Sequence, residues 1–478
     1  MSADSTAFDL VIRGGTVVTP QGPSQLDIGV RDGVIAALGA GLPKGQSEVD
    51  ATGHIVLPGG IDSHCHMDQQ PWEGRSSADD FRTGTLSAMC GGTTTVIPFA
   101  MQMRGQSLRA IVDDYYERAR PKAHIDYSFH LVVGDPTPEV LSRELPALIA
   151  EGCTSIKIYL TYDGLKLDDY EVLQVLDLAR REGAMVMVHA ENDGCIRWLT
   201  ERLLAERKTK IKYHVASHPD IGDREATYRA ISLSELAEAP VLVAHVAAGA
   251  AVDEIRRAKA RGVPIYAETC PQYLFLSADD LDTHDMSGAK CVCTPPPKHK
   301  DNQQHIWRGV LDGTLDCFTS DHSPINYVDK IAGGPDTPFT KIPLGVPGIE
   351  TRLPLLFSAA VSGGRMTLLD FAEITATRAA RLFGLYPRKG VIAVGSDADL
   401  AIWDPEKRVT ITNTILHHAT DYTPYEGMEV QGWPVTTISR GEVVWANGAV
   451  SSNAGRGKFI ACERPLQRMT TPIAALQG

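Results

Sequence analysis

Residues 58–66 read Pro-Gly-Gly-Ile-Asp-Ser-His-Cys-His, a short apolar run that ends in two histidines. Seven similar apolar runs follow it along the chain, at 93–99, 127–133, 155–160, 185–190, 241–246, 264–270 and 317–322. Helix-like segments separate them, at 108–120, 138–151, 168–181, 232–239 and 251–260. Apolar strands that alternate with helices are typical of a parallel sheet buried on both faces. Eight such units predict a TIM-like (β/α)8 barrel over residues 58–385, and an open doubly wound sheet is the alternative.

Both ends of the chain have a different sequence pattern from the middle. Short alternating runs broken by Gly and Pro lie at 9–18, 26–30, 34–38 and 55–57, and again at 398–403, 435–440 and 443–445. Because chain ends often lie close together, we expect residues 1–57 and 386–450 to build one small β-sandwich domain. Residues 451–478 are polar and irregular, which indicates a C-terminal tail, either flexible or placed at a subunit interface.

Composition narrows the class of protein. The 478 residues carry 46 basic and 59 acidic side chains, a net charge of −13. An acidic chain without Lys/Arg runs is a poor binder of nucleic acid or of anionic membranes, and no apolar run approaches the ~18 residues of a membrane span. Nine scattered cysteines do not form a disulfide framework, and the N-terminus lacks the basic stretch of a signal peptide. We therefore expect a cytoplasmic enzyme without nucleic-acid or membrane partners.

The two histidines of the first run indicate a metal site. Alternate strand residues face the same side, so His64 and His66 project together while Cys65 points away. Other metal-binding residue types end other strands: His189, His245 and Asp321. One such residue is usually a satisfied core group, whereas several at corresponding strand ends would be costly without a shared ligand. In a barrel they would meet at the C-terminal face, where active sites lie.

Lys157 lies within the apolar run Ser-Ile-Lys-Ile-Tyr at 155–159. Burial disfavours the charged form of a lysine, and a neutral amine can add carbon dioxide to form a carbamate whose two oxygens can bridge two metal ions. A salt bridge from Lys157 to a nearby carboxylate is the alternative, and spacing alone favours that alternative.

The chain resembles the dihydropyrimidinase/D-hydantoinase family of cyclic amidases, within the amidohydrolase superfamily. The resemblance runs from Gly14 to Gly441 and is specific for the family, much less so for the substrate. The matching stretches are 58–66, 91–95 (Gly-Gly-Thr-Thr-Thr), 188–192 (Val-His-Ala-Glu-Asn), 267–273 (Ala-Glu-Thr-Cys-Pro-Gln-Tyr), 294–296 (Thr-Pro-Pro), 320–322 (Ser-Asp-His) and 421–427 (Asp-Tyr-Thr-Pro-Tyr-Glu-Gly).

The resemblance implies two divalent metal ions, usually Zn²⁺, with Mn²⁺ or Co²⁺ as substitutes. One ion would be held by His64, His66, Lys157 and Asp321, and the other by Lys157, His189 and His245. Lys157 would be the carboxylated bridge. Metal ions lower the pKa of bound water toward ~7, and Asp321 would move the proton of the attacking water to the leaving nitrogen. The family is commonly tetrameric, which implies a homotetramer.

Substrate contacts are also implied by the resemblance. Tyr162 matches the tyrosine that hydrogen-bonds the developing oxyanion. Main-chain groups at Thr294, where Ser is common, and at Leu344, where Asn is usual, would read the ring. Leu344 either places an apolar group beside the substrate or faces the protein interior. Met67, Trp72 and the loop 159–165 are candidates to line the pocket for a ring substituent.

The expected activity is ring opening of 5-substituted hydantoins or dihydropyrimidines to N-carbamoyl amino acids. Allantoin or a cyclic imide is the alternative substrate. Dihydroorotate fits less well, because its carboxylate calls for an Arg soon after the His-x-His, whereas Met67-Asp68-Gln69 follows here and the nearest Arg is Arg75. A non-catalytic scaffold protein of the same fold is a further alternative. Such relatives have lost metal ligands, whereas all six candidate ligands are present here.

Overall fold

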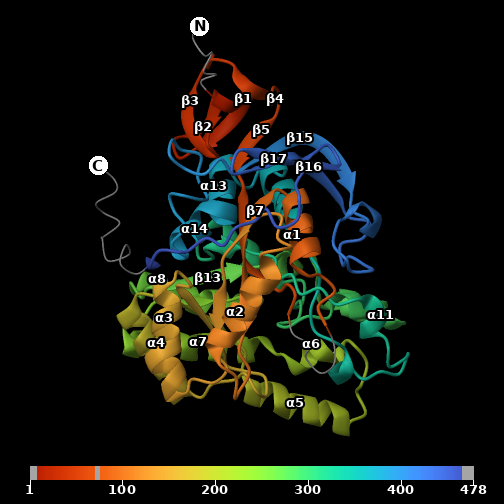
Figure 1. The fold of residues 1–478 in the computed structure, drawn as a ribbon. Coiled ribbons are helices and arrows are strands. Elements are labelled where there is room, and N and C mark those ends of the chain that lie inside the picture. Colours follow the sequence, from red (N-terminus) through yellow and green to blue (C-terminus); the bar gives the residue numbers. More distant parts are fainter. Residues whose placement is uncertain (1–7, 70–75, 466–478) are drawn as a thin grey trace.

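The computed structural model describes residues 8–69 and 76–465 of the chain. A small β domain lies above a barrel (Figure 1). Its sheet follows the order β18-β17-β16-β15-β5-β1-β2-β3, with β4 also paired to β1. The strands from the two ends of the chain are β1 (Phe8–Thr19), β2 (Gly22–Arg31), β3 (Val34–Gly39), β4 (Gly45–Asp50), β5 (Ile55–Pro58), β15 (Leu400–Thr410), β16 (Glu429–Ser439), β17 (Glu442–Ala446) and β18 (Ala449–Val450). The predicted β-rich domain built from both ends is confirmed.

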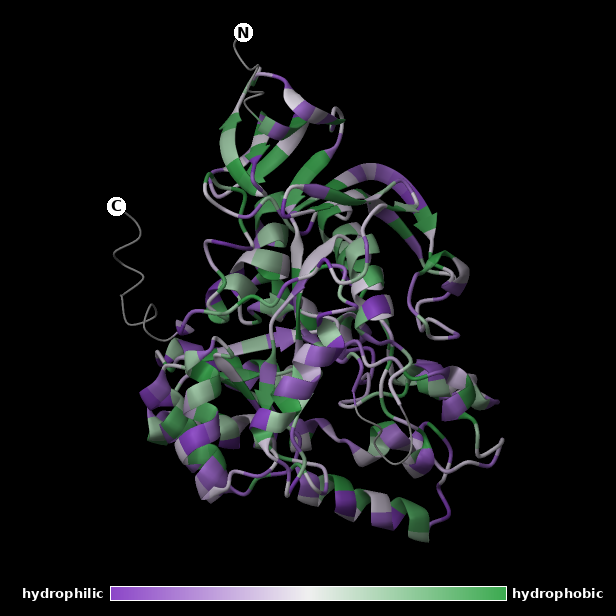
Figure 2. Cartoon of the chain, in the orientation of Figure 1, coloured by the Kyte–Doolittle hydropathy of each residue, from purple (hydrophilic) through white to green (hydrophobic). Residues whose placement is uncertain are grey.

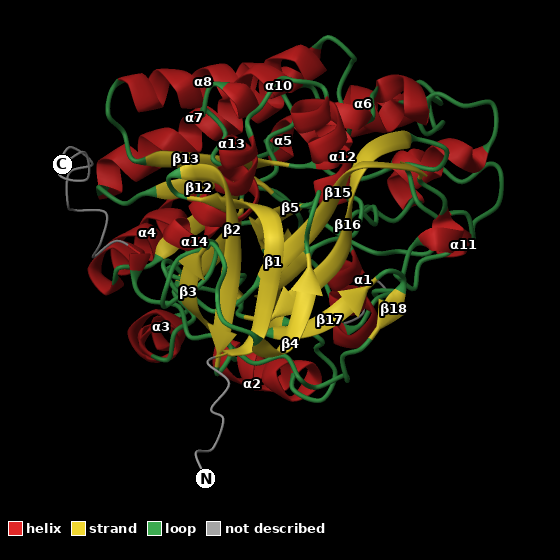
Figure 3. Cartoon of the chain, turned by 90° about the horizontal axis from the view of Figure 1, so that it is seen from above, coloured by secondary structure: helices red, strands yellow, loops and turns green. Residues whose placement is uncertain are grey.

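The two halves of this sheet join where β15 pairs antiparallel with β5, for example Ala401 with Leu57. Figure 3 shows β15 and β16 continuing the layer formed by β5 and β1. β4 has no counterpart among the predicted strands, because its residues are mostly exposed and polar and lack an apolar alternation. For the same reason β15 extends well past the predicted run, along an exposed outer half.

The eight predicted runs form the parallel barrel. Their strands are β6 (Gly60–Cys65), β7 (Thr93–Met101), β8 (Asp126–Tyr127) with β9 (His130–Val132), β10 (Ser155–Tyr159), β11 (Met185–His189), β12 (Val241–Val243), β13 (Ile265–Thr269) and β14 (Cys317–Phe318). Hydrogen bonds from His66 N to His322 O (2.7 Å) and from Asp321 N to His64 O (2.9 Å) join the first strand to the last. This bridge excludes the open doubly wound sheet and confirms the (β/α)8 barrel.

Helices cover the outside of the barrel. The longer ones are α1 (Phe81–Cys90), α2 (Leu108–Ala119), α4 (Asp169–Glu182), α5 (Asp193–Ala205), α7 (Asp220–Ala237), α8 (Gly249–Ala260) and α10 (Asn302–Leu311). The predicted helical segment 138–151 contains a short π-helix, Val140–Glu144, that continues into α3 (Leu145–Ala150). Outer helices such as α4 mix hydrophilic and hydrophobic residues (Figure 2) and bury one face, which in α4 includes Val172, Val175 and Leu176, the pattern of a helix packed on a core.

Shorter helices build the loops at the C-terminal ends of the strands and the segments after β14. They are α6 (Tyr213–Ser217), α9 (Pro271–Phe275), α11 (Tyr327–Lys330), α12 (Arg352–Leu356), α13 (Leu368–Ala372) and α14 (Arg378–Leu382). Within the described ranges, no helix is long and apolar enough to cross a bilayer. All nine cysteines lie in the described part of the chain, and all are free thiols.

The described part of the C-terminal segment packs on its own barrel. Ile460 N donates to Tyr127 O (2.7 Å), Cys462 N donates to Gly152 O (2.9 Å), and the Phe459 ring lies 4.7 Å from that of Tyr116, between centroids. Residues 466–478 of the predicted tail lie outside the described residues.

Candidate metal centre and pocket

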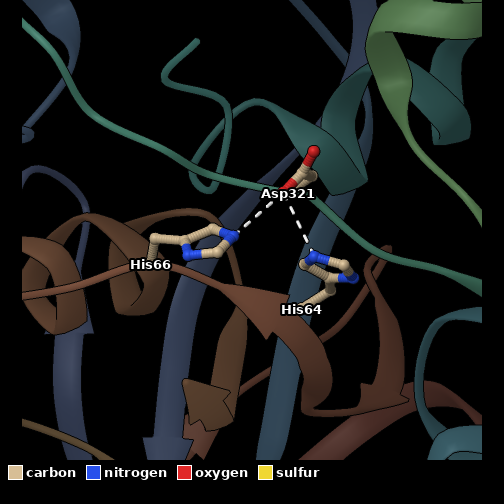
Figure 4. Close-up of side chains that lie close together, drawn as sticks. All are labelled: His64, His66 and Asp321. Carbon is tan, nitrogen blue, oxygen red and sulfur yellow. Dashed lines mark ion pairs between the residues drawn. The ribbon is translucent and has the colours of Figure 1, made fainter. Parts of the chain in front are cut away.

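His64, His66 and Asp321 meet at the seam between the first and last barrel strands. Nε2 of His64 lies 3.2 Å and Nε2 of His66 lies 3.3 Å from the same oxygen of Asp321 (Figure 4). One ligand atom from each residue lies within 4.8 Å of the others, a spacing that could hold a metal ion. The seam creates this cluster, because the main-chain bond from Asp321 N to His64 O fixes the two strands in register.

His189 and His245 extend the cluster across the barrel. Their rings lie 4.4 Å apart, and the ring of His245 lies 5.1 Å from that of His64, both between centroids. The four predicted histidines and Asp321 therefore converge on one place at the C-terminal ends of β6, β11, β12 and β14. Tyr159 and Tyr162 pack against His189, at 5.4 and 5.2 Å between ring centroids.

Lys157 is fully buried beneath these side chains. Its Nζ lies 5.3 Å from the ring centroid of Phe99 and 5.4 Å from that of Tyr159. Within residues 8–69 and 76–465 this atom has no hydrogen-bond partner and no ion pair. Burial lowers the pKa of Lys157 to about 8. The salt bridge considered as the alternative is thus not formed, and a lone buried amine is left facing the histidines.

Two buried glutamates orient the histidines, and the sequence analysis missed both. Glu268 on β13 hydrogen-bonds Nδ1 of His64, which leaves Nε2 toward the centre. Glu191 accepts from Nε2 of His189 at 2.8 Å, which leaves Nδ1 of that ring free for a ligand. Carboxylates that hold the second nitrogen of a histidine are the usual support of metal ligands. Both glutamates fall inside motifs quoted above, but nothing in the sequence shows which histidine each one reaches.

The electrostatics of the cluster favour cation binding. Burial lowers the pKa of His66 and His189 and takes that of His245 well below its ordinary value, so these rings are neutral ligands at pH 7. Burial acts the opposite way on Asp321, but the neighbouring His64 and His66 hold its pKa well below the usual range. At His64 burial is outweighed by the charges of Glu268 and Asp321, which raise the pKa of the ring, so a metal ion would displace its proton. Imidazoles with one carboxylate suit Zn²⁺ and similar divalent ions.

The backbone is strained at three of these residues. His245, Asp321 and Tyr162 have φ of 34°, 46° and 75°, in the left-handed region that non-glycine residues rarely adopt. Such conformations cluster at functional sites, where the surrounding structure holds them.

A cavity of about 480 Å³ opens above the cluster. The predicted residues Tyr162, Thr294 and Leu344 line it, and Thr294 Oγ1 donates to Glu191 at 2.8 Å. Tyr159 and Leu165 of the predicted loop line it as well. Leu344 reaches both environments that were considered, since it lines the cavity and also packs against a buried apolar cluster.

Met67 does not line the cavity. It is fully buried in the hydrophobic core, where its side chain packs against Gly84 of α1. The prediction was wrong because the strand ends at Cys65 and the chain turns inward after His66. Trp72 lies outside the described residues.

Comparisons with known proteins agree with this geometry. The model of the Amidohydrolase family matches residues 55–444. The chain is 42% identical to a D-hydantoinase of Rhizobium radiobacter, over 95% of this chain and 98% of that one. A solved D-hydantoinase structure superposes with a TM-score of 0.93 at 40% identity, covering 96% of this chain and 100% of that chain. The dihydropyrimidinase from Brevibacillus agri NCHU1002 gives 0.92 at 41% identity, covering 95% and 98%.

The chain therefore belongs to the amidohydrolase family. Within it, the chain is similar over nearly its whole length to the D-hydantoinases and dihydropyrimidinases, which confirms the resemblance inferred from the motifs. The hydantoinases of this family depend on divalent metal ions, and the residues at the strand ends fit such ions.

Proposed function

We propose that the protein is a metal-dependent hydrolase that opens the ring of cyclic amides, with 5-substituted hydantoins and dihydropyrimidines as substrates and N-carbamoyl amino acids as products. The observation that carries the proposal is the convergence of four histidines, Asp321 and Lys157, whose amine has no partner in the described part of the chain, beneath one cavity. The chain is also about 40% identical to D-hydantoinases.

We assign one metal ion to His64, His66 and Asp321 and a second ion to His189 and His245, with Lys157 bridging them as a carbamate. The donor types fit this assignment, and so does the buried amine of Lys157, which lacks any partner in the described residues. Carboxylation would turn that amine into an anion with two ligand oxygens. Zn²⁺ is the proposed metal, with Mn²⁺ or Co²⁺ as substitutes. When bound, the ions supply a water of lowered pKa and polarise the ring carbonyl.

Asp321 is the proposed proton carrier. Its carboxylate lies at the centre of the cluster and at the base of the cavity. As the water adds to the ring carbonyl, Asp321 takes a proton from it. When the C–N bond breaks, the proton passes to the leaving nitrogen and the carbonyl carbon becomes a carboxylate. Tyr162, which lines the cavity beside His189, is the proposed donor to the carbonyl oxygen as that oxygen gains charge.

The cavity favours an uncharged ring with an apolar substituent. Met101, Leu165, Ile325, Ile342 and Leu344 contribute apolar side chains to its lining. Among the described residues that line it there is neither Lys nor Arg, and a substrate carboxylate such as that of dihydroorotate would want such a cation. Main-chain groups at Thr294 and Leu344 are the proposed ring contacts. The D-enantiomer is the proposed substrate, as in the names of the relatives.

An initial-rate panel tests the substrate class. Metal-loaded protein is given the D- and L-forms of 5-aryl and 5-alkyl hydantoins, hydantoin, dihydrouracil, allantoin and succinimide. The proposal expects the fastest opening for D-5-substituted hydantoins. If allantoin or succinimide is opened faster, that compound is the better substrate and the hydantoin assignment is wrong. If the metal-loaded protein opens none of these rings, the proposed function is refuted.

We further propose a homotetramer located in the cytoplasm. The tetramer rests on the family resemblance. The location rests on the nine free thiols, eight of them buried, which suit a reducing compartment. We keep the three proposed divisions of the chain: the β-rich domain (1–57 together with 386–450), the barrel (58–385) and the C-terminal tail (451–478). Light scattering on the metal-loaded protein tests the assembly, since a monomer or a dimer would contradict it.

A further inference from the structure

The motif Asp421-Tyr422-Thr423-Pro424-Tyr425 has no part in the proposed chemistry, yet it touches the cavity wall through a buried lysine. Asp421 caps the start of α11, accepting from Tyr327 N (2.6 Å) and from Val328 N (3.2 Å). The ring of Tyr422 packs against that of Tyr327, at 6.1 Å between centroids. These contacts hold α11 in place and direct its last residue, Lys330, into the protein.

Lys330 is 1% exposed. Its Nζ donates to the main-chain oxygen of Val292 at 2.8 Å and lies 5.9 Å from the ring centroid of Tyr422. Within the parts of the chain that the structure describes, Lys330 forms no ion pair with a carboxylate. Burying the polar amine of a lysine without a carboxylate partner in the described residues is costly, so its placement against one carbonyl calls for a reason.

The carbonyl of Val292 is the junction of two loops. It also accepts a hydrogen bond from Gly345 N at 3.1 Å. Val292 precedes Cys293 and Thr294, and Gly345 follows residues 342–344; all of these except Val292 line the cavity. We call Cys293, Thr294 and residues 342–345 the ring wall. Both halves of the ring wall are therefore tied to one oxygen atom, and Lys330 fixes the position of that atom.

Gly345 allows this close approach. Its φ is +142°, and a Cβ at this position would lie 2.5 Å from Ser323 Oγ, so no other residue fits without movement. The hydroxyl of Tyr422 donates to Gly345 O at 3.5 Å. The second half of the ring wall is thus held from its N–H by Val292 and from its carbonyl by the same motif that positions Lys330.

We infer that Lys330 is a positioning residue, which sets the spacing between the two halves of the ring wall and thereby the affinity for the cyclic amide. The inference rests on the proposed function, in which main-chain groups of Thr294 and Leu344 read the ring. Among the described residues, Lys330 belongs neither to the lining of the cavity nor to the metal cluster, so it would act on the substrate through the ring wall.

Lys330→Met removes the donor while keeping an unbranched side chain of similar length. We expect the KM for D-5-substituted hydantoins to rise about tenfold, with kcat within about threefold of the wild type and bound metal unchanged. KM for unsubstituted hydantoin should rise by the same factor, because the main-chain groups of the ring wall would bind the ring and not its substituent. Lys330→Gln, which keeps a shorter neutral donor, should recover part of the loss and serves if the Met variant does not fold.

Lys290→Met is the matched control. The amine of Lys290 lies 5.0 Å from the ring centroid of Tyr327, and among the described hydrogen bonds the side-chain donor to Val292 O is Lys330 and not Lys290. This variant should keep the wild-type KM. A folded, metal-loaded Lys330→Met protein with an unchanged KM, or a Lys290→Met protein with the same rise, would overturn the inference.

Hydrogen–deuterium exchange separates the failure of this inference from that of the proposed function. In Lys330→Met, and not in Lys290→Met, exchange should speed up in peptides covering residues 291–295 and 342–346. If the wild type opens no ring at all, the proposed function fails and exchange alone decides the role of Lys330. Wild-type exchange in both loops of Lys330→Met would refute that role.

Discussion

Replacing Lys157 by Met separates the effect of this buried side chain on folding stability from its proposed role in metal binding. Lys157 is fully buried, and its amine has no partner among the described residues. Burial lowers its pKa from 10.5 to about 8, so the unfolded chain holds the proton more tightly than the folded one. The shift corresponds to about 3 kcal/mol. The folded state is destabilised by this full amount below pH 8, and the destabilisation disappears as the pH rises from 8 to 10.5.

Metal-free Lys157→Met should therefore be more stable than metal-free wild type, by up to about 3 kcal/mol at pH 7, and the difference should vanish near pH 10.5. Urea unfolding of chelator-treated proteins in buffer free of carbon dioxide measures it. The same variant should lose the bridged pair of ions, so that stability and metal content change in opposite directions.

Lys389→Met is the control of opposite sign. Lys389 is also buried, but its Nζ lies 2.7 Å from Asp126, 3.0 Å from Asp397 and 2.6 Å from Asp399. Removing it leaves Asp399 without a cation among the described residues, whereas Asp126 keeps Arg440 and Asp397 keeps Arg388; the loss should cost about 3–5 kcal/mol. The reasoning about Lys157 would be refuted if metal-free Lys157→Met were less stable than wild type, or if it bound two metal ions as tightly.

Three further substitutions test the site. Glu268→Gln should weaken metal binding about 10- to 100-fold, since it removes the carboxylate that orients His64; competition with a chelator measures this, and wild-type affinity would contradict the role of Glu268. Asp321→Ala should lower kcat by at least about 100-fold even in protein that retains metal, and unchanged turnover would exclude Asp321 as the proton carrier. Leu344→Asn should raise KM for bulky apolar 5-substituted hydantoins about tenfold relative to KM for hydantoin. The control Thr294→Ser should leave the ratio of these two KM values unchanged. An unchanged ratio in Leu344→Asn would show that the Leu344 side chain does not contact the substituent.

Most of the architecture could be predicted from the chain itself. The barrel strands are continuous apolar runs because both of their faces are buried, and this made all eight recognisable. His64, His66, His189, His245 and Asp321 stood out because polar side chains at the ends of apolar strands are rare. Strand β4 escaped detection because an exposed edge strand has no apolar periodicity.

Pairings between distant segments could not be predicted. Glu268 lies far from His64 in the chain, and only closure of the barrel brings its carboxylate to that ring. The same holds for Lys330 and Val292. Met67 follows a metal-ligand candidate directly, yet the turn after His66 sends it into the core beside Gly84. Such outcomes depend on three-dimensional packing and leave no local pattern in the sequence.

Titration of metal-free protein with Zn²⁺ in bicarbonate buffer tests the central claim most directly, with bound metal and the opening rate of a D-5-substituted hydantoin followed in the same sample. The account predicts two ions per chain, with activity that appears as the second ion binds. Two bound ions without ring opening, or full activity in protein that carries no metal, would contradict it.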